Sequence, residues 1–529
     1  MLEFPASYAQ ERMWFFHRLD RANPSYHVPL LLRLCGRLDP ERLERALERV
    51  TDRHEILRTT YTDEGGELRQ RVHDRLPVPF DRIALAAPPA DGPSPVTRDP
   101  AVATLVGEFV RAPFDLAAGP PLRVRLLRLA ADDHLLMLCQ HHIATDGWSL
   151  GVLVGELDAA YRDVPLPEPA IQYADYAEWR RATLTGDALD AELDHWRSRL
   201  GANPPRLALP TDRPRPQEPT FRGARVDFAL SPETSDAIRA VGRRHGASLY
   251  MTVLAAWSAL LHRYGAGGDL VIGTLLANRE NEQVAPLLGL FVNTLPVRVD
   301  LTGEPAFAEL LGRVRTATLD VLAHQDTPTE KIIERLRPGR EDGGNPLFQV
   351  LFALQNFAGQ HLELGGLDVE RVDDEEESTR FDLELHVWEH PGHLRGALVF
   401  DTDLFDRATA ERMVEHLRTL LAAVSADPGA PLATLPLRPE EDERRLRDRL
   451  AAGGGPVVLD GHGRVPPEGV PGDVWEGSRR TGERGRVRPD GTAEILTEAG
   501  PDGRLPDLVR ADGRRVLRAD LEDALLRAE

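Results

Sequence analysis

The feature that most constrains the fold is the apolar run HLLMLCQHH at residues 134–142, which ends in two adjacent histidines. Its unbroken apolar centre is typical of a strand buried on both faces, and such strands lie in the middle of layered α/β folds. After IATDGW, apolar residues recur at helical spacing from Leu150 to Tyr161. The pattern therefore predicts a central strand, a turn that carries Asp146 and Gly147, and then a helix.

Strands and helices alternate on both sides of a proline-rich stretch at residues 203–220, which we interpret as an extended connection. The chain has 529 residues, of which 42% are hydrophobic, so it can bury more than one core. From residue 438 the composition changes to a charged, helix-like run that ends in three glycines. The sequence thus predicts an α/β (α+β) fold with lobes at residues 1–180 and 181–437, a linker at 438–456 and a small segment at 457–529.

Charge and composition exclude several classes of protein. The formal net charge is −21 at pH 7, which leaves no excess of positive charge to neutralise a phosphate backbone. No stretch approaches the roughly 18 apolar residues of a membrane span, and the N-terminus lacks a basic leader with an apolar core. We expect a cytoplasmic monomer without nucleic-acid or membrane partners. Cys35 and Cys139 lie in apolar, strand-like runs, which predicts buried, reduced thiols.

The paired histidines allow more than one interpretation. Histidine and aspartate are metal ligands, but adjacent strand residues point to opposite faces and no HExxH spacing is near, so no metal site is predicted. His141 is expected to be a hydrogen-bonded core residue. His142 lies at the strand end, where reacting groups of α/β lobes emerge, and its imidazole is mostly a neutral base at physiological pH. The residues alone leave a catalytic and a structural role open for His142.

HHIATDGWS at 141–149 resembles the HHxxxDG signature of the condensation domains of nonribosomal peptide synthetases, within the chloramphenicol-acetyltransferase-like superfamily. Six further stretches resemble the other family motifs in their order, so that the resemblance covers about residues 1–436. They are SYAQERMWF at 7–15, RHEILRTTY at 53–61, YADYAEW at 173–179, IGTLLANRENEQVAPLLGLFVNTLPVR at 272–298, HQDTPTEKI at 324–332 and NPLFQVLFALQN at 345–356.

The resemblance implies two acetyltransferase-like lobes in a V-shaped pseudo-dimer, with a tunnel between them and the HHxxxDG motif near its middle. Phosphopantetheine arms of carrier proteins would enter from opposite ends, one with an acyl or peptidyl thioester and the other with the acceptor amine. No bound cofactor is expected. The implied reaction is attack of the amine on the thioester, which gives an amide without a covalent enzyme intermediate.

Physical chemistry limits what His142 would contribute to this reaction. An α-amine has a pKa near 8, so roughly a tenth of it is already neutral at pH 7. Orientation of the reactants can supply ~7 kcal/mol or more, whereas a well-placed base adds about 10²–10⁴-fold. We predict that His142 hydrogen-bonds the amine and takes its proton as the tetrahedral intermediate forms. Gly147 would leave room for the substrate arms and turn its backbone amide to developing negative charge.

Asp146 is grouped with His142 and Gly147 as a site residue, although its place in the turn favours holding the loop. The resemblance suggests that it forms an ion pair with Arg279, which would tie the motif loop to the second lobe. Scaffold support is expected from His141, Trp148 and Arg58, and polar groups that face the tunnel are expected from Ser149, Asn293, Gln349 and Asn356.

Two departures from the family pattern concern the tunnel wall or the carrier-docking surface. Thr329 stands where a phenylalanine is usual and Leu290 where a second aromatic residue is common. Stretches after residue 457 resemble the C-terminal end of adenylation domains, but Glu483 replaces the aspartate of TGD and Lys331 is the only lysine in the chain. The segment is therefore expected to be a non-catalytic remnant or a β-rich cap on the second lobe.

Neither a carrier segment nor a GxSxG thioesterase elbow is found in the sequence. We expect a free-standing enzyme that receives its donor from a carrier protein in trans, with a carrier-bound or soluble amine as acceptor. In one alternative, His142 passes an acyl group from a carrier or coenzyme A to a soluble amine or alcohol, so that the product is an amide or an ester. In another, the protein docks carrier proteins without turnover. The intact second histidine favours catalysis.

Overall fold

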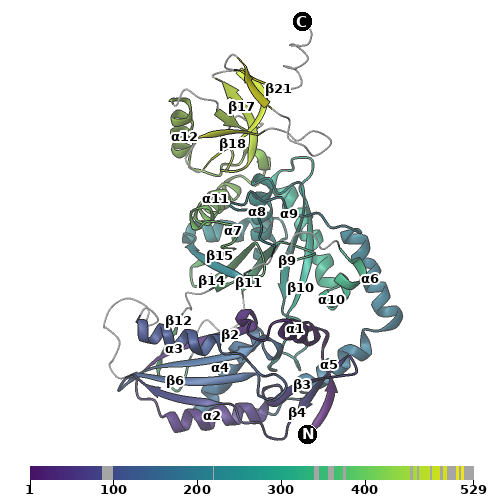
Figure 1. The fold of residues 1–529 in the computed structure, drawn as a ribbon, viewed down its shortest axis with the longest axis vertical. Helices are drawn as coiled ribbons and strands as arrows, with labels where there is room; N and C mark the ends of the chain where they lie inside the picture. Colours follow the sequence, from purple (N-terminus) through teal and green to yellow (C-terminus); the bar gives the residue numbers. More distant parts are fainter. Residues whose placement is uncertain are drawn as a thin grey trace.

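The computed structural model describes the chain in twelve ranges. They are residues 1–85, 99–217, 220–338, 345–355, 363–372, 377–452, 457–460, 464–476, 479–488, 492–496, 508–511 and 514–517. Two α/β lobes and a small β-rich unit follow one another along the long axis of the molecule (Figure 1). This arrangement confirms the mixed α/β class expected from the sequence.

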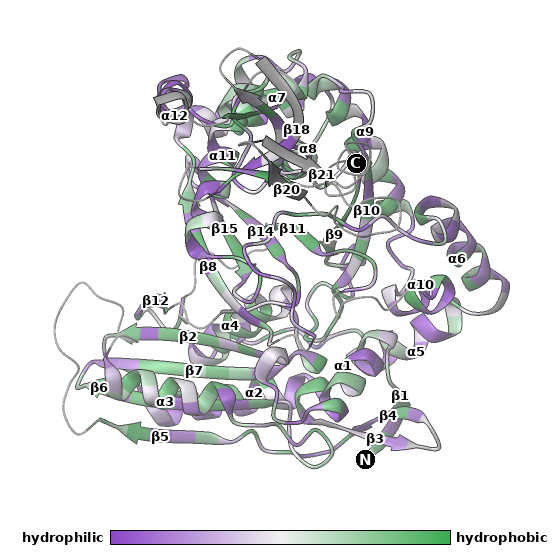
Figure 2. Ribbon diagram, turned by 45° about the horizontal axis from the view of Figure 1, so that its top comes forward, coloured by the Kyte–Doolittle hydropathy of each residue, from purple (hydrophilic) through white to green (hydrophobic). Residues whose placement is uncertain are grey.

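The first lobe is built on a five-stranded sheet with the order β12-β2-β7-β6-β5. Its middle strand, β7 (Asp133–His141), is buried from its second residue to its last, as the apolar run predicts. Antiparallel neighbours β2 (His27–Cys35) and β6 (Leu122–Ala130) flank β7, while β5 (Phe80–Ala84) pairs in parallel with β6. Hydrophobic residues follow β7 along its length (Figure 2). The two histidines of the motif thus stand at the end of the central strand.

Two helices of this lobe begin directly after an aspartate that caps them. The carboxylate of Asp39 accepts from the backbone of α2 (Pro40–Arg53), and that of Asp146 accepts from the backbone of α4 (Gly147–Tyr161). These helices pack against each other. The other elements of the lobe are α1 (Tyr8–Leu19), η1 (Pro24–Tyr26), η2 (Glu55–Arg58), α3 (Pro100–Arg111), η4 (His142–Ala144), α5 (Tyr173–Thr183) and a sheet of β1 (Leu2–Pro5), β4 (Glu67–Val72) and β3 (Thr59–Glu64).

The second lobe contains a seven-stranded sheet in which the parallel pairs β9–β11 and β11–β14 lie among antiparallel ones. Its most deeply buried helix is α8, whose residues 251–261 are all buried. In sheet order the strands are β10 (Asn293–Asp300), β9 (Asp269–Leu276), β11 (Val350–Gln355), β14 (Leu383–His390), β15 (His393–Asp401), β8 (Arg222–Ala229) and β13 (Glu377–Ser378). The helices are α6 (Gly186–Leu200), α7 (Pro232–Arg244), α8 (Leu249–Arg263), α9 (Phe307–Ala323), α10 (Thr329–Leu336) and α11 (Arg407–Ala426).

Two segments from the second half of the chain complete the first lobe. Strand β12 (Asp368–Val372) extends the first sheet by pairing with β2. Leu287 and Phe291 are buried in the core of the first lobe rather than in that of the second. The lobes are therefore interleaved. A division of the sequence at residue 180 does not show that segments from the second half of the chain return to the first lobe.

The C-terminal part begins with η5 (Leu432–Thr434) and α12 (Glu440–Ala452), the second of which occupies the charged run predicted as a linker. A four-stranded sheet follows, and Val470, which directly precedes its second strand, is buried in the core of the second lobe. Arg412 of α11 forms an ion pair with Glu468 at 2.8 Å. The β-rich unit thus packs on the second lobe. Its strands are β16 (Val457–Leu459), β17 (Pro471–Glu476), β18 (Arg479–Val487) and β19 (Ala493–Leu496), with a separate pair of β20 (Leu508–Ala511) and β21 (Arg514–Leu517).

Two predictions from composition concern single residues and long helices. Cys139 is buried as predicted, whereas Cys35 is only half-buried, with its thiol 3.8 Å from the Asp133 carboxylate. Among the helices that the structure describes, none is both long and apolar enough to cross a membrane.

Candidate active site

A cavity of about 1160 Å³ lies between the two lobes, and the motif opens onto it. His142, Asp146, Gly147 and Trp148 all contribute to its wall. Opposite them stand side chains of the second lobe, from strands β9, β11 and β14 and the segments before them. Examples are Leu275, Phe348, Leu351, Arg380 and Glu384. The strand-to-helix turn predicted from the sequence therefore faces a cavity that both lobes build.

His142 is held in one orientation and one protonation state. Its Nδ1 lies 2.8 Å from the backbone oxygen of Thr145. Because a carbonyl oxygen only accepts, Nδ1 must carry the proton, and Nε2 is left as an acceptor. Burial, together with the positive charge of Arg380, lowers the pKa of His142 to about 4. The imidazole is therefore neutral at physiological pH.

His141 is turned away from the cavity, into the core of the first lobe. Its Nδ1 accepts from the backbone N–H of Ile143 at 3.1 Å. The rings of His17, His27 and Phe114 surround it at centroid distances of 5.3, 6.2 and 5.9 Å. Burial lowers the pKa of His141 well below its usual value. Adjacent residues of one strand thus meet different environments, and only the second faces the cavity.

The Asp146 carboxylate is saturated by donors from the protein. Its Oδ1 accepts from the backbone N–H and the hydroxyl of Ser149, both at 2.8 Å. Its Oδ2 accepts from the backbone N–H groups of Phe291 at 3.0 Å and Val292 at 3.3 Å. Arg279 Nη2 lies 3.1 Å from Oδ1, which is the ion pair that the resemblance suggested. With its lone pairs in use, this carboxylate holds the motif loop against the second half of the chain.

Arg279 completes this connection, which we call the Asp146–Arg279 clamp. Its Nη1 donates to the backbone oxygens of Val284 and Leu287 at 3.1 and 2.7 Å. Its guanidinium also stacks over the Phe291 ring at 4.1 Å. Burial lowers the pKa of Arg279, while the charge of Asp146 opposes that shift. The clamp is fully desolvated, so removal of either charge would leave the other buried without a partner.

A family model of the condensation domain matches residues 2–447. The chain belongs to the condensation domain family. A component of the linear gramicidin synthase from Brevibacillus parabrevis is 40% identical over 450 residues, which cover 84% of this chain and 9% of that protein. Phosphinothricin tripeptide synthetase PhsC from Streptomyces viridochromogenes is 40% identical over 452 residues, which cover 84% of this chain and 41% of that protein. This condensation domain thus spans less than half the length of either relative.

A solved complex of the X-domain and OxyB from teicoplanin biosynthesis has a chain of similar fold. The TM-score is 0.74 and the sequence identity 31%, and the match covers 83% of this chain and 97% of that chain. The family match ends near the C-terminus of α12 and leaves out the β-rich unit.

Three residues predicted to face the tunnel of the condensation domain do not line the cavity. Ser149 is buried, and its hydroxyl donates to Asp146 and accepts from the backbone N–H of Gly289. Asn293 donates through Nδ2 to the backbone oxygens of Gln325 and Thr327. Gln349 is bonded to backbone groups of Leu207 and Asn345. These predictions were wrong because each amide or hydroxyl bonds to neighbouring protein groups instead. Asn356 lies outside the described residues.

Two residues predicted to support the site donate hydrogen bonds to backbone oxygens of other segments. Trp148 donates from its indole nitrogen to the backbone oxygen of Ala285 at 3.0 Å. Arg58 donates to the backbone oxygen of His73. Of the two departures from the family motifs, Thr329 lines the cavity, whereas Leu290 is buried in the core of the first lobe. The substitution at residue 329 is therefore the one that changes the wall.

Sequence reasoning missed Arg380, which stands in the wall opposite the motif. Its Nη2 donates to the backbone oxygen of Ser25 at 2.6 Å, and its guanidinium lies 3.9 Å from the Tyr26 ring centroid. Arg380 thus crosses from the second lobe to the first and adds to the depression of the His142 pKa. It belongs to none of the seven motifs, so no local pattern could have singled it out.

Proposed function

We propose that this condensation domain joins an amine to an acyl or peptidyl thioester presented by a carrier protein, and so forms an amide. The observation that carries the proposal is the state of His142, a neutral imidazole in a cavity built by both lobes, with Nε2 free of the proton. The names of two relatives, a linear gramicidin synthase and a tripeptide synthetase, support this chemistry.

In the proposed step, the lone pair of the amine forms a C–N bond to the thioester carbonyl carbon, and the carbonyl π electrons move to oxygen. His142 Nε2 accepts a proton from the nitrogen as positive charge develops there. When the oxygen returns its electron pair, the C–S bond breaks and the phosphopantetheine thiolate leaves with the proton from His142. Gly147 is the first residue of α4, where backbone N–H groups lack helical acceptors and favour negative charge. Its N–H would face the oxyanion.

The low pKa of His142 limits its role. A base whose conjugate acid has a pKa of about 4 cannot deprotonate an ammonium group of pKa near 8. The amine must therefore enter in its neutral form, and His142 takes a proton only after the C–N bond has begun to form. Most of the rate enhancement then comes from orientation in the cavity. Asp146 acts as a positioning residue, because its clamp fixes the loop between His142 and Gly147.

Phosphopantetheine arms would supply the donor, and the acceptor would be an amine that is either carrier-bound or soluble. Transfer to a soluble alcohol, or from coenzyme A instead of a carrier, would use the same imidazole. A second candidate function is carrier or protein docking without turnover. This second function is supported by the similarity to an X-domain that was solved in complex with another protein, OxyB.

The test is intact-protein mass spectrometry of a carrier loaded with an acyl or aminoacyl thioester. The loaded carrier is incubated with the protein and a panel of carrier-bound amines, free amines and free alcohols. We expect transfer to an amine, and a loss of about 10²–10⁴-fold in His142→Ala. The control is His390→Ala, an exposed histidine at the β14–β15 turn, which should leave the rate unchanged.

Other outcomes separate the alternatives. Transfer to alcohols but not to amines would replace amide formation by ester formation. Carrier binding without transfer by either protein would favour the docking function. Equal rates for the wild type and His142→Ala would contradict the role of the imidazole.

A further inference from the structure

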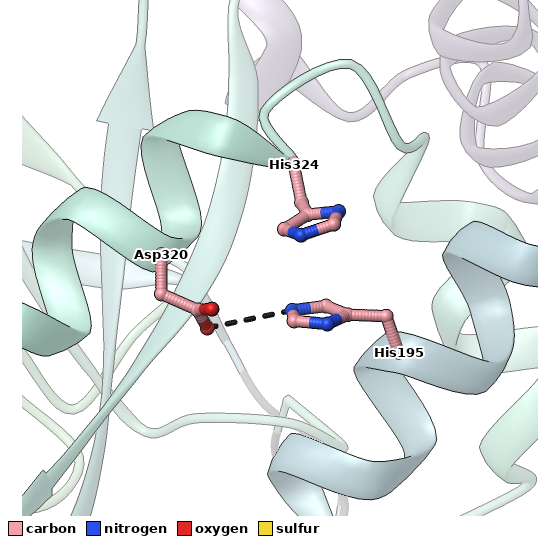
Figure 3. A group of neighbouring side chains, drawn as sticks. All are labelled: His195, Asp320 and His324. Carbon is pink, nitrogen blue, oxygen red and sulfur yellow. Dashed lines mark ion pairs between the residues drawn. The ribbon is translucent and has the colours of Figure 1, made fainter.

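A second group of potential ligands lies outside the cavity, where α6 meets the end of α9. It consists of His195 on α6, Asp320 in the last turn of α9 and His324, the residue that caps α9. One ligand atom from each residue lies within 4.8 Å of the others. Figure 3 shows the two imidazole rings stacked, with the Asp320 carboxylate beside them. We call these residues the His195–Asp320–His324 cluster.

One ligand spacing inside the cluster, between His195 and Asp320, is close to that of ligands around one metal ion. His195 Nε2 lies 3.4 Å from Asp320 Oδ2, and the two rings are 3.6 Å apart with an interplanar angle of 15°. Two ligands on a tetrahedral Zn²⁺, each bound at ~2.0–2.1 Å, are themselves separated by ~3.4 Å. Apart from its contact with Asp320, Nε2 of His195 is buried and lacks a hydrogen-bond partner within the described part of the chain. At this separation, either a proton on the ring nitrogen or a metal ion can lie between the nitrogen and the carboxylate oxygen.

Neighbouring groups hold the ligands in a suitable state. Glu192 Oε2 lies 2.8 Å from His324 Nδ1, so the proton of that ring is on Nδ1 and its Nε2 is free to coordinate. A carboxylate behind a histidine is the usual arrangement around protein-bound zinc. Arg199 Nε lies 2.8 Å from Asp320 Oδ2 and holds that carboxylate in place. The guanidinium is about two-fifths exposed, so it can move aside from an incoming ion.

We propose that His195, Asp320 and His324 bind a divalent transition-metal ion of the zinc type, with water at the fourth position. Two imidazoles and one carboxylate suit Zn²⁺, and the same set is poorly suited to Mg²⁺ or Ca²⁺, which prefer oxygen ligands. The stacked rings must tilt toward each other for their nitrogens to converge. Both side chains are about one-quarter exposed, which leaves room for that tilt.

A bound metal ion would stabilise the turn between α9 and α10, which contributes to the cavity wall. His324 opens the turn that leads to α10, and Thr327 in that turn donates to Glu192 at 2.8 Å. Asn293 donates a hydrogen bond to the backbone oxygen of Thr327 in the same turn, and Thr329 at the end of the turn lines the cavity. Through these contacts, an ion between α6 and α9 would hold the turn in place. The metal site does not depend on the proposed amide formation, because no member of the cluster lines the cavity.

The test uses the full chain, stripped with a chelator and then titrated with Zn²⁺ in isothermal calorimetry. Metal content after gel filtration and the absorption spectrum of the Co²⁺-loaded protein provide independent readouts. We expect one equivalent of Zn²⁺, a tetrahedral Co²⁺ spectrum and a rise in melting temperature. His195→Ala and His324→Ala should each abolish the stoichiometric binding.

The chain offers a matched control in a second pair of histidines. His390 and His393 stand opposite each other on the β14–β15 hairpin, with ring centroids 4.7 Å apart. His393→Ala should leave zinc binding unchanged. The proposal is overturned if the wild type retains no stoichiometric zinc, or if the zinc is lost in His393→Ala and kept in His195→Ala. Asp320→Asn, which preserves size, serves as the ligand variant if an alanine variant fails to fold.

Discussion

The Asp146–Arg279 clamp and the His195–Asp320–His324 cluster both join residues that are far apart in the sequence, but their polar atoms end up differently. In the clamp, both charged side chains are almost completely buried and the carboxylate oxygens accept from backbone, hydroxyl and guanidinium donors. In the cluster, the side chains are partly exposed and one ring nitrogen lacks a hydrogen-bond donor or acceptor partner among the described residues. The saturated and buried Asp146 carboxylate holds the fold, whereas the partly exposed side chains of the cluster leave room for a ligand.

The largest effect expected from this comparison comes from breaking the clamp. Asp146→Ala leaves the Arg279 guanidinium buried without a counter-charge and should reduce the free energy of unfolding by about 3–5 kcal/mol. Urea unfolding followed by fluorescence measures it. Glu309→Ala removes an exposed ion pair with Arg313 on α9 and should cost less than about 1 kcal/mol. Wild-type stability in Asp146→Ala, together with lost transfer, would refute the structural assignment of Asp146.

We expect low pH to reduce the stability of the first lobe, because its buried imidazoles resist protonation in the folded state. Burial lowers the pKa of His27 and of His142 to about 4, whereas an unfolded histidine has a pKa near 6.5. Between these values the unfolded chain binds more protons, so stability is complete above pH 6.5 and falls as the pH drops toward 4. Each histidine contributes up to about 1.4 kcal/mol per pH unit in that window.

Urea unfolding at pH 7.5, 6.0 and 5.0 measures this loss, with metal removed by a chelator so that the cluster does not contribute. His390→Ala should show the same pH dependence as the wild type, because His390 is exposed. An unfolding free energy that stays flat from pH 7.5 to 5.0 would contradict the burial argument.

The smallest expected effect concerns the zinc affinity of the His195–Asp320–His324 cluster. Glu192→Gln keeps a side chain of the same size but removes the carboxylate behind His324, and should weaken zinc binding about 10–100-fold. Calorimetric titration measures the change. Glu334→Gln, at an exposed pair with Lys331, is the matched control and should bind zinc as the wild type does. Equal affinities for Glu192→Gln and the wild type would remove Glu192 from the site.

Local signals in the sequence were sufficient to predict the main secondary-structure elements around the motif and the start of the C-terminal part. The apolar run predicted β7, the turn with Asp146 and the apolar periodicity after it predicted α4, and the change in composition from residue 438 marked the C-terminal part. The resemblance to condensation domains placed the motif, and the family match confirmed it. These signals work because strand burial and helix capping depend mainly on residues next to one another in the chain.

The environment of each polar side chain could be established only from the tertiary structure. Nothing in the sequence shows that Ser149 and Asn293 lie outside the cavity wall, or that Arg380 is part of it. No metal-ligand spacing occurs near the paired histidines of the motif, whereas His195 and His324 meet only because α6 packs beside the end of α9.

The sequence by itself therefore determined the class of the fold, the family and the strand-to-helix turn that carries His142. The tertiary structure alone decided which polar atoms are satisfied by the protein and which remain open to a ligand. The physical reason is that a hydrogen bond or a coordination site requires atoms within about 3 Å of each other. When the partners come from distant parts of the chain, only packing of the folded lobes brings them that close.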